Sequence, residues 1–457
     1  MTQLGILYIT LTVAMLLFRK SLARVLAVAG ATPIGVVLSL GGEGAPAFYI
    51  LGCVALIIAL AGALRARRPE LTQGRRIGKS HLLLFAAWCL LVTAAAPILF
   101  SGTPVLAPRG GIDAEVLDPS SLEFTVSNFA QGAYLVLGAG VVCYLSQSRA
   151  STPGLLALPL GGFLLISVWR LASMRAGLPF PEGFFDNSEG VRIIERTATG
   201  GDRFRGIGSE PSTVGRYSIV AIVYFTWLAK YLAGWRKTGS MALVVVGVIL
   251  GAASTSTLFV VTAGVVCLAV AATRTMQFVG GGVLKPSVFL GATALVILGI
   301  PFLPRLFQIV AGILTDKTDS SSFYARSSSD LFSMGVARDT LLFGAGLGSN
   351  RPSSLFAMLL SCVGVIGTAL FVLVVVSLVR GAWAHEEYRP VVGALLTLLA
   401  AKVIAGPSLS DPLLWISLGV LARAAWSVEP FHVHAESAVR HRKGDTRRRQ
   451  GVLDAVR

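Results

Sequence analysis

Arginine is unusually frequent in one polar segment of the chain, residues 170–216. The segment holds seven arginines, among them Arg203, Arg205 and Arg216, together with six carboxylates that include Glu210. A guanidinium group matches two phosphate oxygens at once and keeps its proton, so such a cluster can hold a diphosphate and stabilise negative charge on it as a leaving group. The same composition also fits a loop whose charges pair with one another, and the residue types leave both interpretations open.

A second polar segment, residues 304–352, has a similar mixture of charges. Its basic residues are Arg305, Lys317, Arg326, Arg338 and Arg351, and its acids include Asp330 and Asp339. Together the two segments could surround one phosphate group. A third polar segment, residues 101–128, is acidic and is interpreted as a solvated loop.

These segments must be positioned by strongly hydrophobic elements. The chain has 457 residues, of which 54% are hydrophobic and 14% charged, whereas soluble domains carry about 25% charged residues. Hydrophobic runs of about 20 residues recur along it, and each could cross roughly 30 Å of hydrocarbon as a helix. The five cysteines lie within these runs and form no CxxC pair, so neither a disulfide framework nor a metal site is indicated.

Hydropathy predicts an all-α, polytopic membrane protein. We expect one integrated domain over residues 1–427, with the three polar segments as long loops, followed by a basic tail over 428–457. The thirteen predicted spans are 3–18, 25–41, 46–64, 82–100, 129–147, 155–169, 217–234, 241–254, 257–273, 287–303, 353–379, 391–406 and 413–427.

The distribution of lysine and arginine predicts the orientation of these spans. Residues 65–79 are rich in arginine and lysine, which marks a cytoplasmic loop because basic flanking residues resist translocation. Counting spans from there places the N-terminus and the three long loops outside and the C-terminus in the cytoplasm. The net charge of +16 is then mainly a topology signal, and the basic tail requires no nucleic acid. The tail could also bind anionic membrane lipid.

Two motifs stand out within the polar segments. The first is RFRGIGSEPS at 203–212, which leads directly into a predicted span with Arg216 at its start. The second is SSSFYAR at 320–326, with the glycine-rich run LLFGAGLGSN at 341–350, whose first glycine, Gly344, lies about eighteen residues after Arg326. The chain resembles the O-antigen polymerase and O-antigen ligase family of bacterial membrane glycosyltransferases in these motifs, in their order and in its hydropathy.

This resemblance implies transfer of an oligosaccharide from a polyprenyl diphosphate to a sugar hydroxyl. The reaction would invert the configuration at the sugar, proceed without metal or cofactor, and take place on the outer face of the bacterial inner membrane. The implied substrate is a polyprenyl-diphosphate-linked oligosaccharide. A flippase and a chain-length regulator of the same pathway are the implied protein partners.

The resemblance and the charges together nominate site residues. Arg203 and Arg326 match the arginines of the family motifs, whereas Arg205, Arg216, Arg338 and Arg351 are added because of their charge and location. Glu210 is the first candidate for the base that removes the acceptor proton, although a structural ion pair explains it equally well. Asp330 and Asp339 are the reserve candidates. Lys402 either pairs with Asp411 or helps to hold the lipid diphosphate.

Two departures from the family pattern bear on the reaction. The ligase branch is associated with a histidine in the large outside loop, but all five histidines of this chain fall on the predicted cytoplasmic side, which favours a polymerase. Many relatives also carry an arginine after the serine in the segment equivalent to 252–257, and this chain has none there. We interpret that segment as a tight helical hairpin, with serines and threonines satisfying its backbone groups.

Three alternatives to a polymerase remain at this point. They are a ligase that moves the finished glycan to another acceptor, a transporter of lipid-linked oligosaccharide, and a purely structural membrane subunit. The glycine run at 344–348 resembles a phosphate-binding loop, but no strand precedes it and no Gly-Lys-Ser follows it. We expect it to form a tight turn before a helix that re-enters the membrane.

Overall fold

The structure is a computed structural model of the chain. It describes residues 1–18, 20–40, 43–65, 73–106, 118–187, 203–281 and 321–426. The predicted span 287–303 and the basic tail 428–457 lie outside these residues, as do Arg305 and Lys317.

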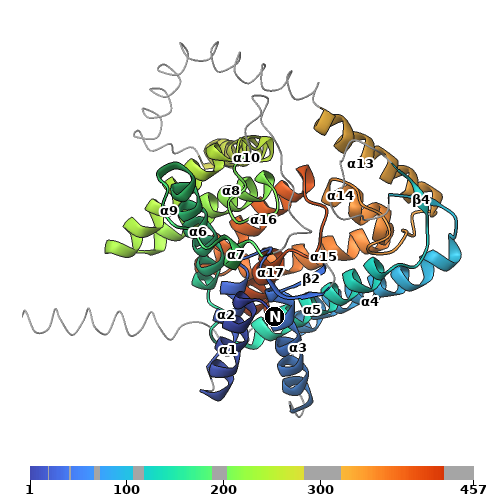
Figure 1. Ribbon diagram of the computed structural model, residues 1–457, viewed down its shortest axis with the longest axis horizontal. Coiled ribbons are helices and arrows are strands. Elements are labelled where there is room, and N and C mark those ends of the chain that lie inside the picture. The colour runs from blue at the N-terminus through green and yellow to red at the C-terminus, as the bar shows by residue number, and fades with distance from the viewer. Residues whose placement is uncertain are drawn as a thin grey trace, which may run out of the picture.

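The chain folds as a bundle of helices with two short antiparallel hairpins (Figure 1). The strands are β1 (Val36–Leu40) paired with β2 (Glu43–Pro46), and β3 (Pro104–Val105) paired with β4 (Ser120–Ser121). The helices are α1 (Gln3–Leu17), α2 (Ala23–Ala29), α3 (Ala47–Arg65), α4 (Gln73–Leu99), α5 (Val126–Gln147), α6 (Ala157–Ala176), α7 (Glu182–Phe185), α8 (Pro211–Leu228), α9 (Gly234–Ala253), α10 (Thr257–Gly281), α13 (Ser321–Asp339), α14 (Leu355–Met358), α15 (Gly364–Trp383), α16 (Arg389–Ile404) and α17 (Pro412–Trp426).

Seven of the described helical segments are long and apolar enough to cross a membrane, so the chain is a polytopic helical membrane protein. Four further helices, α1, α8, α16 and α17, occupy predicted spans but do not meet that criterion. The seven segments are Ala47–Leu64, Gly78–Leu99, Val126–Gln147, Pro153–Ala176, Gly234–Ala253, Thr257–Met276 and Leu355–Trp383.

The predicted span 25–41 is wrong as a continuous helix. Helix α2 ends at Ala29, and the chain then turns through Gly30 and Pro33 into strand β1. Proline supplies no N–H for a helix, and the β-branched valines that follow favour an extended chain. Asn187 completes the hydrogen bonding of Val36, since its side chain donates to the Val36 carbonyl and accepts from the Val36 N–H, both at 2.9 Å.

Helix α17 lies at the centre of the bundle and is buried on all sides. Twelve of its residues are buried, including Trp415. The Trp415 ring lies so close to Gly138 of α5 that a side chain at Gly138 would collide with it. The close contact between α5 and α17 therefore depends on this glycine, and most of the core surrounds these two helices.

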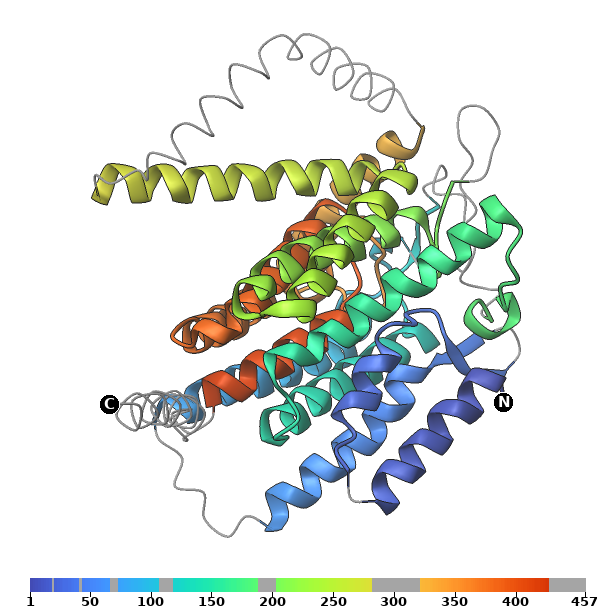
Figure 2. The ribbon, with the colours of Figure 1, turned by 90° about the vertical axis from the view of Figure 1, so that its left-hand side faces the viewer.

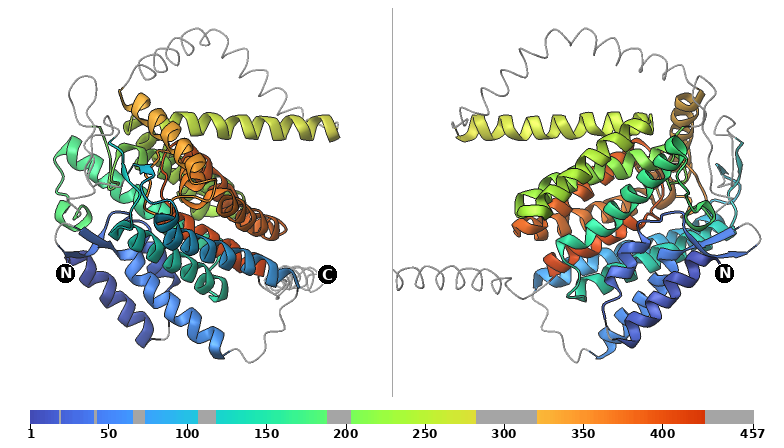
Figure 3. Two further views of the ribbon diagram at one scale, coloured as in Figure 1. Left: turned by 90° about the vertical axis from the view of Figure 1, so that its right-hand side faces the viewer. Right: turned by 60° about the vertical axis from the view of Figure 1, so that its left-hand side comes forward.

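The described parts of the long polar segments lie at one end of the bundle, which we call the loop end (Figures 2 and 3). It carries residues 100–106, 118–125, 177–187, 203–210, 254–256, 340–354 and 405–411. Direct contacts join them: the Arg351 N–H donates to the Leu106 carbonyl at 2.9 Å, and the Gly406 N–H donates to the Ser353 carbonyl at 3.0 Å. The opposite end carries the short connections 148–152, 229–233 and 384–388.

Candidate functional site

A buried charge cluster joins α8, α16 and α17 at the loop end. The ammonium group of Lys402 donates to Oδ2 of Asp411 at 3.2 Å, and Nε of Arg216 lies 3.7 Å from the same oxygen. The other carboxylate oxygen of Asp411 accepts from the Leu413 N–H at 3.0 Å and so caps the start of α17. The predicted Lys402–Asp411 ion pair is confirmed, and Arg216 is its third member.

The turn 405–411 covers the cluster on its Arg216 side. Gly406 has a φ of +114°, and a side chain at this position would collide with the Arg216 guanidinium. Burial alone would raise the pKa of the Asp411 carboxyl, but the charges of Lys402 and Arg216 lower it below its ordinary value. Asp411 is therefore ionised at neutral pH, and the cluster holds two cations and one anion.

Arg203 is held at the tip of the hairpin between α9 and α10. Its guanidinium donates to the hydroxyl of Thr255 at 3.1 Å and to the Thr255 carbonyl at 2.9 Å. The hairpin is tight, as predicted: Thr255 has a φ of +47°, and the Ser254 hydroxyl donates to the Gly251 carbonyl at 2.7 Å. Arg203 thus fixes the 203–210 segment to the tip of this hairpin.

The hairpin tip and α13 both approach the charge cluster. Leu258, just after the tip, packs with Ala401 and Ala405, which precede and follow Lys402 in the sequence. From the other direction, Asp330 of α13 accepts from the N–H groups of Ser353 and Ser354 at 2.7 and 3.0 Å. Because the Ser353 carbonyl in turn accepts from Gly406, α13 is joined to the turn above Arg216.

Arg326 lies one helical turn before Asp330 on α13, and its side chain is partly exposed. The helix that carries it is fixed by the Asp330 contacts, so Arg326 belongs to the same end of the bundle as Arg203 and Arg216. Asp330 itself is bonded to the two N–H groups that precede α14, which weakens it as a reserve base.

Arg205 belongs to a different cluster. Its guanidinium forms a short ion pair with Asp186. The Asp186 carboxylate also accepts a hydrogen bond from the Arg170 guanidinium at 3.0 Å. Arg170 further donates to the Gly206 carbonyl at 2.6 Å, and Asp186 is only 2% exposed. In this part of the segment 170–216, the arginines are therefore used in internal ion pairs.

Glu210 stands at the N-terminus of α8, directly before Pro211. Its carboxylate accepts a short hydrogen bond from the Ser212 hydroxyl and is partly exposed. No ion pair is found for it among the described residues, so the structural ion pair considered for Glu210 is absent there.

The two remaining candidate arginines, Arg338 and Arg351, are both exposed. Arg338 ends α13 with its side chain 83% exposed, and its contact is with the adjacent Asp339 at 3.3 Å. Arg351 is exposed, and its backbone is bonded to Leu106 and to the Ser329 hydroxyl.

The glycine run forms a tight turn, as predicted. Gly344, Gly346 and Gly348 have φ values of +98°, +94° and +79°. The N–H groups of Ala345 and Gly346 donate at 2.7 and 2.8 Å to the carbonyls of Ser361 and Cys362, which belong to the π-helical turn Leu359–Val363 before α15. Because these donors are satisfied within the protein, the turn is not a phosphate cradle.

Two buried asparagines fix this turn, and the sequence reasoning missed both. Asn128 of α5 donates to the Leu347 carbonyl at 2.8 Å and to the Ser349 hydroxyl at 2.6 Å. Asn350 donates to the hydroxyls of Ser333 and Ser361 and accepts from the Leu106 N–H. The available signal was the Thr125-x-x-Asn128 pattern, which marks the start of α5 but not its long-range partners.

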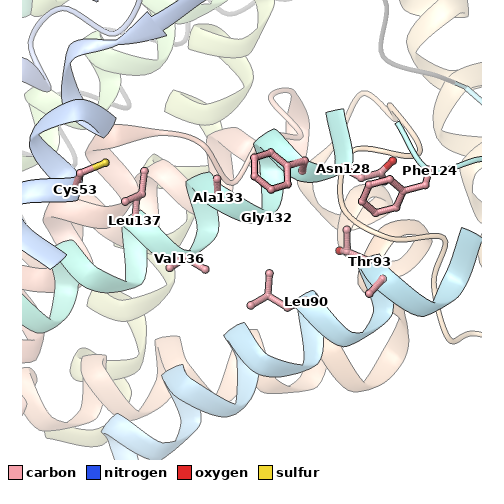
Figure 4. A pocket seen from close by; sticks show the side chains of 11 residues that line it. Cys53, Leu90, Thr93, Phe124, Asn128, Gly132, Ala133, Val136 and Leu137 are labelled. Carbon is pink, nitrogen blue, oxygen red and sulfur yellow. The ribbon is translucent and has the colours of Figure 1, made fainter. Parts of the chain in front are cut away.

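An apolar groove of about 530 Å³ runs between α4 and α5 (Figure 4). Leu90 of α4 faces Ala133 and Val136 of α5 across it, and Cys53 of α3 lies toward one end. Thr93 and Asn128 lie at the other end, where they contact the glycine turn through Leu347. The groove therefore extends from the hydrophobic part of the bundle to the loop end.

No metal site is formed in the described part of the chain, because no three His, Cys, Asp or Glu side chains meet there. The two described histidines, His81 and His385, lie toward the opposite end of the bundle.

The fold and the site define a polytopic helical membrane protein with a cationic cluster at the loop end. No family model matches the chain, and no curated protein matches it either.

Proposed function

We propose that this protein is a membrane glycosyltransferase that polymerises lipid-linked oligosaccharide. In this proposal it transfers the growing chain from polyprenyl diphosphate to a sugar hydroxyl of the next lipid-linked unit, on the outer face of the inner membrane. The N-terminus and the loop end face outward. The observation that carries the proposal is that Arg216 and Lys402 share Asp411 at the loop end of a membrane-embedded bundle, while Arg203 is held on the hairpin tip that packs against α16.

The charges at this end suit a diphosphate leaving group. Arg216 has a side chain 13% exposed, and its cluster carries one more positive than negative charge. Arg203 and Arg326 approach from the hairpin tip and from α13. Fixed cations stabilise the charge that develops on the diphosphate as the glycosidic bond breaks. In our proposal Arg203 and Arg326 are catalytic residues, and Arg216 binds the diphosphate.

A base is needed on the acceptor side. In the proposed step the acceptor hydroxyl oxygen attacks the anomeric carbon, the bond from that carbon to the diphosphate breaks, and the hydroxyl proton passes to a carboxylate. Glu210 is the best placed candidate, since Asp330 is bound to two N–H groups and Asp339 contacts Arg338. Polyprenyl diphosphate leaves with the bonding electrons.

The apolar groove between α4 and α5 is an argument for a substrate that carries a lipid chain. Most of its apolar lining belongs to helices that can cross a membrane, and one end of it lies beside the glycine turn. An isoprenoid chain lying there would keep its hydrocarbon out of water while its diphosphate remained at the loop end. A flippase that supplies the donor and a chain-length regulator are the partners that this reaction would need.

The test is product formation by the purified protein in nanodiscs. The protein is incubated with the lipid-linked oligosaccharide of its host, without added metal or nucleotide, and the glycans are separated on a gel. A ladder of lengthening lipid-linked chains is expected. Transfer to an added non-lipid acceptor without a ladder would instead establish a ligase, and unchanged substrate with a folded protein would contradict both activities.

A further inference from the structure

The charge cluster at Asp411 is unbalanced, and its members differ sharply in access. Lys402 is 1% exposed and Asp411 is 6% exposed, whereas the Arg216 side chain is 13% exposed. Lys402 is therefore too deeply buried to touch a ligand. Arg216 is the most exposed member of the cluster, while Nε of its guanidinium is buried and has no hydrogen-bond partner.

The distances show how the single carboxylate is shared. Oδ2 of Asp411 is closer to Lys402, at 3.2 Å, than to Arg216, at 3.7 Å. The second oxygen is occupied by the Leu413 N–H. The contact with Arg216 is too long for a hydrogen bond, so of the two cations only Lys402 donates a hydrogen bond to Asp411.

We propose that Lys402 is a positioning residue that neutralises Asp411 and thereby leaves the Arg216 guanidinium available to a diphosphate. The inference rests on the proposed function for its ligand, a lipid diphosphate. Without Lys402, the Asp411 carboxylate would pair with Arg216 alone, and the cluster would have no net charge. With Lys402 in place, the cluster keeps one positive charge on the side chain that faces the loop end.

The geometry of the turn 405–411 fits this role. Gly406 packs directly against the Arg216 guanidinium, and a side chain there would displace it. The turn is tied to Lys402 at one end and to Asp411 at the other. The Lys402–Asp411 ion pair thus fixes the turn that packs against Arg216 and also determines the net charge of the cluster.

Binding of farnesyl diphosphate to the full-length protein in nanodiscs tests the proposal without any glycan. We expect Lys402→Met to weaken binding about tenfold, because one unit of charge is removed close to the ligand. The double variant Lys402→Met with Asp411→Asn restores the net charge, so its affinity should return to within about threefold of the original. Inorganic pyrophosphate should compete for the site.

Lys230→Met provides the matched control. Lys230 is exposed near the opposite end, where it lies 5.1 Å from the ring centre of Trp227. Its loss removes the same charge from the protein but should leave farnesyl diphosphate binding unchanged. Thermal unfolding of each variant, measured without ligand, verifies that the compared proteins are folded.

A double-mutant cycle of Lys402 and Arg216 tests whether Lys402 affects binding through Arg216. In an Arg216→Gln background, Lys402→Met should cause no further loss of affinity, because the residue through which Lys402 acts is gone. Equal affinity of the folded Lys402→Met protein and the unchanged protein would overturn the proposal, as would failure of pyrophosphate to compete. Diphosphate binding with the expected dependence on Lys402, but no glycan product, would overturn the glycosyltransferase and keep the diphosphate site.

Discussion

At the scale of single residues, Asp411 links the acid stability of the protein to its site. Its carboxyl contacts Lys402, Arg216 and the first turn of α17, and these cations lower its pKa. A group with a lowered folded pKa contributes stability above its unfolded pKa of about 3.9 and loses that contribution as the pH falls toward the folded value.

The lowered pKa of Asp411 predicts how the unfolding of the protein depends on pH. The melting temperature of the detergent-solubilised protein should fall as the pH is lowered from about 5 to 3, and part of this fall should be missing in Asp411→Asn. Asp411→Asn should also be less stable at neutral pH, because Lys402 is then buried without its counter-ion. Differential scanning fluorimetry across this pH range measures both effects. An identical pH dependence in the two proteins would contradict the assignment.

Arg326 gives the residue-level test of the proposed reaction. Arg326→Ala should abolish polymer formation in the gel assay while the protein remains folded and inserted. Arg326→Lys keeps the charge but loses the planar fork, so we expect it to recover only a small part of the activity. Arg338→Lys is the comparison, since it makes the same change at the exposed end of the same helix. Normal polymer from Arg326→Ala would remove Arg326 from the site.

At the scale of elements, the glycine turn supports the helices that carry the site. A side-chain carbon at Gly344 would lie 2.7 Å from the Cys362 carbonyl oxygen, and the φ of +98° is strained for any other residue. Gly344→Ala should therefore destabilise the protein by roughly 2 kcal/mol or more. The matched control is Gly335→Ala in α13, where no atom lies within 4 Å and alanine should stabilise the helix by up to about 1 kcal/mol. Chemical unfolding of both variants checks the opposite signs.

The groove between α4 and α5 can be filled without touching a charged residue. A Cβ atom at Gly132 would meet only the Leu90 side chain, at 3.4 Å. Gly132→Leu should therefore fold and narrow the groove. If an isoprenoid chain lies there, the variant should raise the KM for a long-chain donor at least several-fold while changing the KM for a short-chain donor little. Equal effects on both donors would argue against the groove as a tail site.

Hydropathy located most helices because their length and composition are local properties. It failed at 25–41, where Pro33 and the following valines turn the chain into a hairpin covered by neighbouring segments. Lys402 and Asp411 were predictable as partners because they flank one short turn. The pairing of Asp186 with Arg170 and Arg205 was not, since the choice among several nearby carboxylates depends on how α6, α7 and the 203–210 segment pack. The partners of Asn128 were not predictable either, because they lie 219 and 221 residues away in sequence and are brought to it only by packing.

At the scale of the whole molecule, all candidate site residues lie at one end, so orientation decides whether the proposal is possible. In a cysteine-free background, Ser408→Cys reports on the loop end and Ala384→Cys on the opposite end, and both positions are exposed. A membrane-impermeant maleimide should label position 408 in intact cells, and position 384 only after the membrane is opened. Labelling in the reverse order would place the site in the cytoplasm and contradict an outward-facing transferase.

Helix α17 has a consequence for how the protein is made. It fills the centre of the bundle and brings Asp411 with it, yet it is synthesised after every other described helix. Until α17 has been synthesised, the centre of the bundle is therefore empty. The earlier helices cannot reach their final packing before then. The two cations of the cluster likewise have no counter-ion until that moment. A chain arrested before α17 would present an open core and two uncompensated charges, which are features that membrane proteases and insertion chaperones could use to recognise unfinished protein.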